Sequence, residues 1–110
     1  MIPTMLKDEI VSSLKSDAGV LKAFVFGSYA RGTPDPGSDI DIIVIIDRKG
    51  VRQSYGEMQA DRKRINALLL QTRKKIPMDI MVYTNDEWNK IHEDPTDFIR
   101  TVEAEAVPLL

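Results

Sequence analysis

The spacing of apolar and polar residues predicts a chain in which helices and short strands alternate. Apolar runs that end at glycine, proline or polar clusters are typical of strands, and apolar residues repeated every three to four positions are typical of amphipathic helices. Strands are predicted over residues 21–26, 40–46 and 78–83. Helices are predicted over residues 4–15, 28–31, 55–75, 87–93 and 96–104, and an apolar tail follows at residues 107–110.

This order of elements predicts an α/β (α+β) fold in which one sheet is layered with helices. The segment between the first two strands is too short for the crossover that parallel neighbours need, so we expect strands of mixed direction. The chain has 110 residues, which is enough for one hydrophobic core and too few for two. We therefore expect a single small domain over residues 1–110.

Composition narrows the classes of protein to consider. The chain has no cysteine and a single histidine, His92, which excludes disulfides and a thiolate or histidine metal cluster; we expect His92 at the surface near a helix end. The net charge of −2 does not favour nonspecific attraction to nucleic acid. No apolar stretch is long enough to span a membrane and no leader precedes the first helix, so we expect a cytoplasmic protein.

The turn after the first strand has the features of a phosphate site. The run LKAFVF ends at Gly27, where the absence of a Cβ lets the backbone approach a phosphate closely. Ser28 follows with a hydroxyl group, and the backbone N–H groups of the short helix at 28–31 lie beside it. We predict an anion site at this turn.

Carboxylates near the next two strands predict a cation site. Asp39 and Asp41 are two residues apart, so on a strand their side chains share one face. Mg²⁺ takes oxygen ligands and is readily shared between carboxylates and substrate phosphates. Asp79 begins a later strand and would supply a third carboxylate if that strand lies beside residues 40–46. Asp-x-Asp alone arises about once by chance in such a chain, so its context carries the prediction.

Gly27-Ser28, a ten-residue spacer, Asp39-Ile40-Asp41 and a later Asp79 resemble the core signature of the DNA polymerase beta-like nucleotidyltransferases. The form GSYARGTPDPGSDIDIIV is similar in particular to the minimal nucleotidyltransferases, the antitoxin partners of HEPN-domain toxins. The resemblance implies the following roles. Two Mg²⁺ ions would be bound by Asp39 and Asp41, with Asp79 completing one site, and the triphosphate would be held by Gly27 and Ser28.

Arg31 and Ser38 complete the predicted nucleotide-binding residues. Arg31 is placed to steady the leaving phosphates, although a surface ion pair with Asp35 explains it equally well.

The resemblance also implies a substrate and a partner. AMP from ATP would be transferred to a tyrosine hydroxyl of a HEPN-type toxin, silencing it in a hetero-oligomer. Two alternatives stay open: a noncatalytic antitoxin that neutralises the toxin by binding through the helix 55–75 or the tail 107–110, and a small-molecule nucleotidyltransferase of the aminoglycoside-modifying kind.

Three further features have both a structural and a functional interpretation. The outer face of the helix over 55–75 is basic, which indicates a solvated face or a surface that binds an acidic acceptor. Its basic residues are Arg62, Lys63, Arg64, Arg73, Lys74 and Lys75. Trp88 is expected in a core or interface. Thr84 and Glu87 form the pattern of a capping box that opens the next helix.

Overall fold

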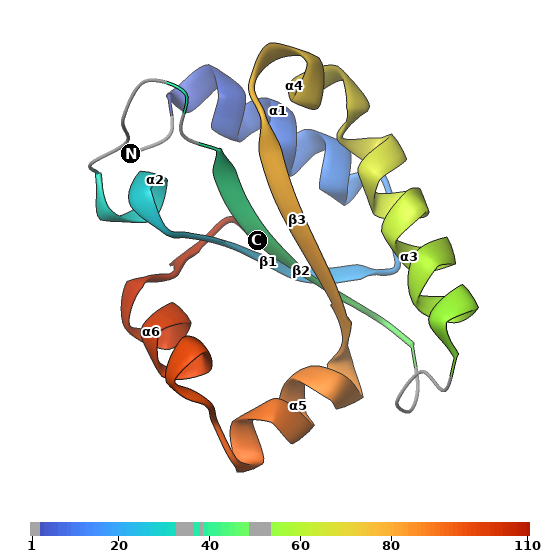
Figure 1. The fold of residues 1–110 in the computed structure, drawn as a ribbon. Helices are drawn as coiled ribbons and strands as arrows, with labels where there is room; N and C mark the ends of the chain where they lie inside the picture. Colours follow the sequence, from blue (N-terminus) through green and yellow to red (C-terminus); the bar gives the residue numbers. More distant parts are fainter. Residues whose placement is uncertain (1–2, 33–36, 38, 49–53) are drawn as a thin grey trace.

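The computed structural model describes residues 3–32, 37, 39–48 and 54–110. Its elements follow the predicted alternation (Figure 1). They are α1 (Thr4–Lys15), β1 (Val20–Phe26), α2 (Ser28–Arg31), β2 (Ile40–Ile46), α3 (Tyr55–Leu68), α4 (Leu70–Lys75), β3 (Met78–Thr84), α5 (Asn85–Glu93), α6 (Asp97–Glu105) and β4 (Val107–Pro108).

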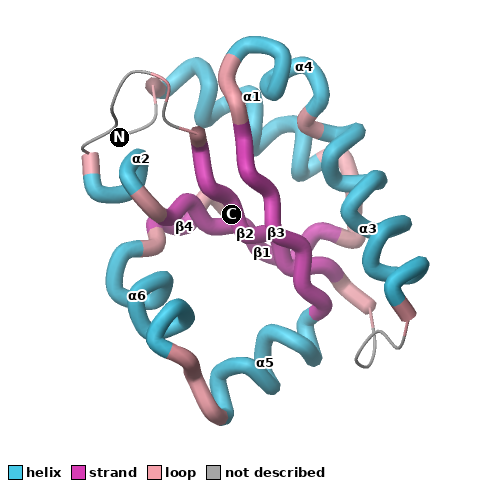
Figure 2. Tube along the Cα trace, viewed as in Figure 1, coloured by secondary structure: helices cyan, strands magenta, loops and turns pink. Residues whose placement is uncertain are grey.

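In the part of the chain that the structure describes, the strands form one sheet of four in the order β3-β2-β1-β4 (Figure 2). β1 is antiparallel to both of its neighbours, whereas β2 and β3 run parallel. The connection through α3 and α4 is long enough for that parallel crossover, and the connection between β1 and β2 is not. The predicted mixed α/β sheet is confirmed.

Helices cover both faces of the sheet (Figure 1). The larger core lies between the sheet and α1 and α3, where Ile10, Leu14, Ile65 and Leu69 are fully buried. The smaller core lies under α5 and α6, where Val102 packs against the opposite face. Two helix layers around one sheet give this short chain its core.

β2 is the central strand and is buried on both faces. Every residue of β2 except Asp41 is fully inaccessible to solvent. Ile40, Ile42, Val44 and Ile46 belong to the larger core, and Ile43 and Ile45 belong to the smaller one. Asp41 therefore shares its face with the α5/α6 side of the sheet.

The predicted helix over 55–75 is wrong as one continuous helix. The structure divides it at Leu69, whose backbone (φ −99°, ψ 10°) leaves the helical region between α3 and α4. Leu69 is fully buried, and the change of direction also buries Thr72 of α4. Helical spacing continues across the break, so the pattern of apolar residues alone does not reveal it.

The capping box is confirmed. The Glu87 N–H donates to Thr84 Oγ1 at 3.1 Å, and the Thr84 N–H donates to Glu87 Oε1 at 3.0 Å. α5 therefore begins at Asn85, two residues before the predicted start. In α6 the N-cap is Thr96, so the helix begins at Asp97, one residue after the predicted start.

The tail at residues 107–110 forms part of the sheet, which the sequence did not predict. Val107 and Pro108 pair with β1, and the Leu109 N–H donates to the Ala23 carbonyl at 2.8 Å. Leu109 and Leu110 pack against the larger core. A two-residue strand containing proline has almost no sequence signal. Its apolar residues are mostly committed to the fold, which weakens the tail as a free interface.

Within the described ranges, no helix combines the length and the apolar character needed to cross a membrane.

Candidate active site

Two of the predicted carboxylates lie side by side in the sheet. Asp41 of β2 is the register partner of Asp79 on β3. Neighbouring strands are about 4.8 Å apart and register partners point to the same face, so both side chains emerge on the α5/α6 side. They lie where β2 and β3 begin, the end at which β1 finishes at Phe26, opposite Asp41. The condition under which Asp79 would join the other carboxylates, that its strand lies beside β2, is met.

The carboxyl group of Asp41 is partly buried and lies close to other negative charges. Partial burial raises the pKa of the Asp41 carboxyl, and the negative charges of Asp79 and then Asp39 raise it further. The positive charge of Arg31 acts in the opposite direction. A carboxyl whose pKa is raised by neighbouring negative charges is one whose repulsion a bound cation would relieve.

Asp39 precedes β2 and is exposed, and it is near enough to act on Asp41 by charge. Across the ranges that the structure describes, no three Asp, Glu, His or Cys side chains are grouped closely enough to hold a metal ion by themselves. The arrangement is thus a carboxylate pair with a third carboxylate nearby. The roles of Asp39, Asp41 and Asp79 as catalytic residues and ligands stay a prediction.

Gly27 brings the backbone directly against this pair. Its φ of 75° and ψ of −154° lie in a region that is essentially restricted to glycine. A Cβ built on Gly27 would lie 2.4 Å from Asp41 Oδ2. Glycine is therefore required twice over, by conformation and by space, and the turn between β1 and α2 closes on the Asp41 carboxylate.

Two of the other predicted nucleotide-binding residues, Ser28 and Arg31, lie on α2 directly after this turn. Ser28 opens α2 and is partly buried, with no capping hydrogen bond from the residue before it. Ser38 lies outside the described residues. Arg31 ends α2, and its Nη1 is 3.0 Å from Glu105 Oε2 at the end of α6. The pairing of Arg31 with Asp35 cannot be compared, because Asp35 also lies outside the described residues.

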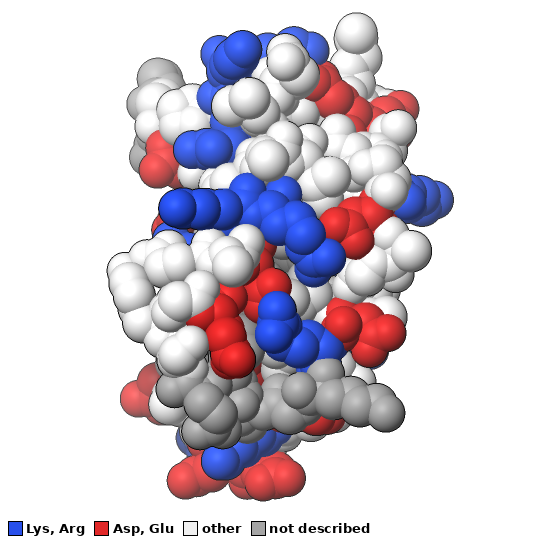
Figure 3. All heavy atoms as spheres, turned by 90° about the vertical axis from the view of Figure 1, so that its right-hand side faces the viewer, with Lys and Arg blue, Asp and Glu red and all other residues white. Residues whose placement is uncertain are grey.

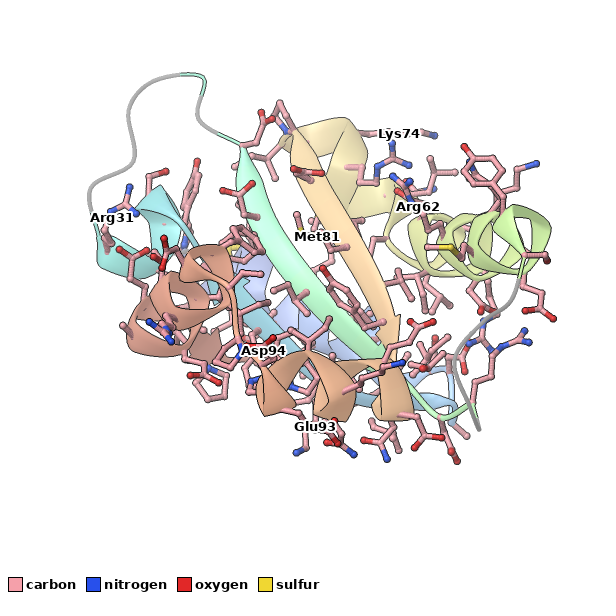
Figure 4. All side chains as sticks on the ribbon, turned by 60° about the horizontal axis from the view of Figure 1, so that its bottom comes forward. Arg31, Arg62, Lys74, Met81, Glu93 and Asp94 are labelled. Carbon is pink, nitrogen blue, oxygen red and sulfur yellow. The ribbon has the colours of Figure 1, made fainter. Side chains whose placement is uncertain are left out.

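Glu105 is a neighbour of the site that the sequence did not indicate. Its side chain joins α6 to α2 across 74 positions of sequence. Arg31 is half exposed in this ion pair, so its guanidinium is accessible at the edge of the site. Figure 4 shows Arg31 on the α2 side of the sheet, with Arg62 and Lys74 beyond β3.

Aromatic side chains occupy the other end of this sheet face. Trp88 of α5 packs against Phe24 and Tyr83, with ring centroids 6.1 and 5.5 Å away. His92 lies 4.6 Å from Trp88 and its Nε2 is 2.6 Å from Glu103 Oε1, so it is partly buried near the end of α5. The prediction of Trp88 as a core aromatic is confirmed. These rings hold α5 against β3 and leave the aspartate end of the face uncovered by them.

A cavity of about 430 Å³ lies behind α2, on the opposite side of the sheet. Val25, Val107 and Leu109 line it together with residues of α1 and α2. Val25 belongs to the larger core, so this cavity is separated from Asp41 and Asp79 by the sheet. It is therefore a feature distinct from the carboxylate pair.

Comparison with known proteins identifies the family of the chain. Residues 7–109 match the family model described as nucleotidyltransferase domain. Poly(A) polymerase PAPalpha of Candida albicans is 44% identical over 54 residues, which are 47% of this chain and only 10% of the polymerase.

Solved structures share the fold at low sequence identity. A crystal structure of a toxin-antitoxin with AMP-PNP matches with a TM-score of 0.55 and 20% identity, covering 94% of this chain and 72% of the other. A mutant of the toxin-antitoxin MntA-HpeT with two Asp-to-Glu substitutions matches with a TM-score of 0.54 and 17% identity, over the same shares.

The matched family model spans nearly the whole chain, including every strand of the described sheet and the Gly27, Asp41 and Asp79 positions. The chain belongs to the nucleotidyltransferase domain family.

Proposed function

We propose that this chain transfers AMP from ATP to a tyrosine hydroxyl of a HEPN-type toxin and thereby neutralises it, with Mg²⁺ as cofactor. The observation that carries the proposal is the in-register pair of Asp41 and Asp79 against the Gly27 backbone. Family membership supports nucleotidyl transfer as the reaction. The donor, the acceptor and the metal are the parts that the proposal adds.

The residues present fit Mg²⁺. The donor set consists of carboxylate oxygens from adjacent strands, which suits a hard cation, and two protein carboxylates leave the remaining positions to water and phosphate. Mg²⁺ bound there would offset the repulsion around Asp41 and polarise the phosphate oxygens. Asp41 and Asp79 would hold it, with Asp39 as the third carboxylate.

The chain's own groups would position the substrates. Gly27 leaves room for a phosphate to approach the backbone, Ser28 offers a hydroxyl donor, and Arg31 offers a charged donor at the edge of the site. Asp79 is exposed on the edge strand β3, so it faces the side from which an acceptor can enter. The site would thus bind ATP between α2 and Asp41 and the acceptor beside Asp79.

The reaction balances as an in-line displacement. The acceptor oxygen forms a bond to the α-phosphorus of ATP, and the bond from that phosphorus to the bridging oxygen of the β-phosphate breaks. Pyrophosphate leaves with that oxygen, and the hydroxyl proton passes to solvent. Arg31 is placed to stabilise the charge that develops on the leaving group.

A protein acceptor is supported by the relatives of known structure. Chains of similar fold occur in toxin-antitoxin crystals, one of which contains the nucleotide analogue AMP-PNP. We therefore place the acceptor hydroxyl on a partner protein. The poly(A) polymerase match makes an RNA hydroxyl the acceptor against which this choice should be tested.

Intact-mass analysis of the partner tests the proposal. A HEPN-type toxin is incubated with ATP, Mg²⁺ and either the wild type, Asp41→Asn or Asp8→Asn. Asp8 is an exposed aspartate of α1 and serves as the matched control. The wild type and Asp8→Asn should add the mass of AMP to the partner, and Asp41→Asn should not.

Two outcomes would contradict the proposal. Toxin inhibition without ATP and without a mass change would establish a noncatalytic antitoxin. Label from α-labelled ATP on an RNA oligonucleotide, with none on the protein, would move the acceptor to nucleic acid.

A further inference from the structure

The helices α3 and α4, which flank the edge strand β3, carry exposed cations whose charge the fold does not use. Arg62 and Lys63 of α3 and Arg73 and Lys74 of α4 are exposed, and among the described residues none of these four has an ion pair. We call Arg62, Arg73 and Lys74 the basic ridge. Their neighbours differ: Arg64 lies 3.4 Å from Asp17 and Lys75 lies 2.7 Å from Glu9, so those two cations help to fix α3 and α4 on the rest of the fold.

The basic ridge lies on the helices that flank the edge strand β3. Lys74 precedes Asp79 by five residues, and five residues of extended chain span at most about 18 Å. In Figure 4, Arg62 and Lys74 lie close together beyond β3, on the side of that strand away from β2. β3 is the last strand of the described sheet on this side, and it carries Asp79. The ridge therefore lies along the outer edge of the strand that an acceptor would pass to reach Asp79.

Exposed apolar groups accompany this charge. On α3, Tyr55 is 73% exposed, and on α4, Leu70 is 44% exposed. Figure 3 shows Lys and Arg side chains along the upper and middle part of this face, where α4 and α3 lie, with acidic side chains beside and below them. Arginine and tyrosine are among the residues enriched at protein interfaces.

The charge distribution selects an acidic ligand. The chain carries a net charge of −2, so a run of unpaired cations on one face is a local departure from the whole molecule. The site itself is acidic, with Asp41 and Asp79, and an acidic segment would be repelled from it and attracted to the ridge. Such a pattern would orient an acceptor by holding its flanking residues away from the carboxylates.

We infer that the basic ridge of Arg62, Arg73 and Lys74 binds an acidic segment of the partner protein that lies beside the acceptor hydroxyl. The inference rests on the proposed function, because it assumes that the acceptor is a protein that enters at the β3 edge. The ligand that we expect for the basic ridge is a polypeptide segment rich in Asp and Glu. The ridge would set which hydroxyl is presented, while the carboxylate pair would carry the reaction.

Fluorescence anisotropy tests the inference without depending on transfer. The probes are a labelled short peptide with glutamates around one tyrosine, the same peptide with lysines in place of the glutamates, and a short single-stranded RNA. The full chain is compared with the double variant Arg62→Glu with Lys74→Glu. The control is Lys22→Glu with Lys90→Glu, which reverses two exposed lysines on β1 and α5; Lys90 matches Lys74 in lying in the last turn of its helix.

The wild type and the control variant should bind the acidic peptide, more weakly as salt increases, and the ridge variant should bind it at least about tenfold more weakly. Thermal melts of all three proteins establish that each is folded. Equal binding by the ridge variant, no binding of the acidic peptide by the wild type, or ridge-dependent binding of the RNA in preference to the peptide would each overturn the inference. Absence of AMP transfer to the partner would instead count against the proposed function alone.

Discussion

Asp41 lies in surroundings that oppose its charge. Burial and the neighbouring Asp79 and Asp39 raise the pKa of its carboxyl, while every other residue of β2 is fully buried and apolar. A carboxylate at the end of the most buried strand is therefore tolerated at a cost in stability, which is typical of residues kept for function.

Replacement of Asp41 by asparagine should stabilise the protein when no divalent cation is present. We expect the free energy of unfolding to rise by about 0.5–2 kcal/mol at neutral pH. Because the pKa of Asp41 is raised in the folded state, the folded protein binds more protons than the unfolded chain at pH values between the ordinary and the raised pKa. The free energy of unfolding of the wild type should therefore fall as the pH rises through this range. Urea unfolding in EDTA across this range measures both effects.

The difference between Asp41→Asn and the wild type should grow as pH rises and vanish in acid, where both side chains are neutral. Asp8→Asn, an exposed aspartate on α1, is the control and should change little. A variant at Asp41 that is less stable than the wild type at neutral pH would show that its charge supports the fold.

Gly27 is the second residue on which the site depends. Alanine there would place its Cβ 2.4 Å from Asp41 Oδ2 and would occupy a backbone region that disfavours side chains. We expect Gly27→Ala to lower the free energy of unfolding by about 1–3 kcal/mol and to abolish nucleotidyl transfer.

Gly37→Ala separates the conformational cost of alanine from the contact of its Cβ with Asp41. Gly37 also has a positive φ, of 85°, but nothing lies within 4 Å of its added Cβ. Only the conformational cost of about 1–2 kcal/mol should remain, with no direct effect on the carboxylate. Similar losses of activity in both variants would argue against a close approach of Gly27 to Asp41 as the requirement.

At the scale of elements, α5 depends on its N-terminal cap. Thr84 ends β3, is fully buried, and exchanges two hydrogen bonds with Glu87. We expect Thr84→Ala to cost about 1–2 kcal/mol in the free energy of unfolding. Thr96 caps α6 with one hydrogen bond from an exposed position, so Thr96→Ala should cost less. Equilibrium urea unfolding compares the two, and an equal or larger loss for Thr96→Ala would contradict the account.

The elements that could be predicted from the sequence are those with strong local signals. The apolar run of β2, the capping residues Thr84 and Glu87, and the helix over residues 4–15 have patterns that local physics determines. The break at Leu69 and the strand at Val107–Pro108 depend on packing against distant residues, and neither has a local signal.

The candidate site also has a part that the sequence could predict and a part that it could not. Gly27, Asp41 and Asp79 could be proposed from their positions at strand ends, whereas the register that sets Asp41 opposite Asp79 is seen only in the structure. The ion pair between Arg31 and Glu105 could not, since 74 positions separate them and only the folded sheet brings α6 beside α2.

At the scale of the whole molecule, binding of a nucleotide with Mg²⁺ should offset the destabilisation of the folded state by the charge of Asp41. A nucleotide with Mg²⁺ that binds only the folded state stabilises it by about 2.7 kcal/mol at a concentration 100 times Kd. We expect the Tm of the wild type to rise with ATP and Mg²⁺ together and far less with ATP in EDTA.

Asp41→Asn should lose most of this increase in Tm, although its Tm without ligands is higher. Thermal denaturation over a series of ATP concentrations measures the shift. An increase that is the same in Asp41→Asn as in the wild type would place nucleotide binding away from the carboxylate pair.

The central claim is that Asp41 and Asp79 together hold the cation of a nucleotidyltransferase site. Its most direct test is anomalous diffraction from crystals of this chain grown with Mn²⁺ and a nonhydrolysable ATP analogue. We predict an anomalous peak about 2–2.5 Å from carboxylate oxygens of both Asp41 and Asp79, with the phosphates of the analogue beside Gly27. A fully bound analogue whose Mn²⁺ contacts neither carboxylate would contradict the account.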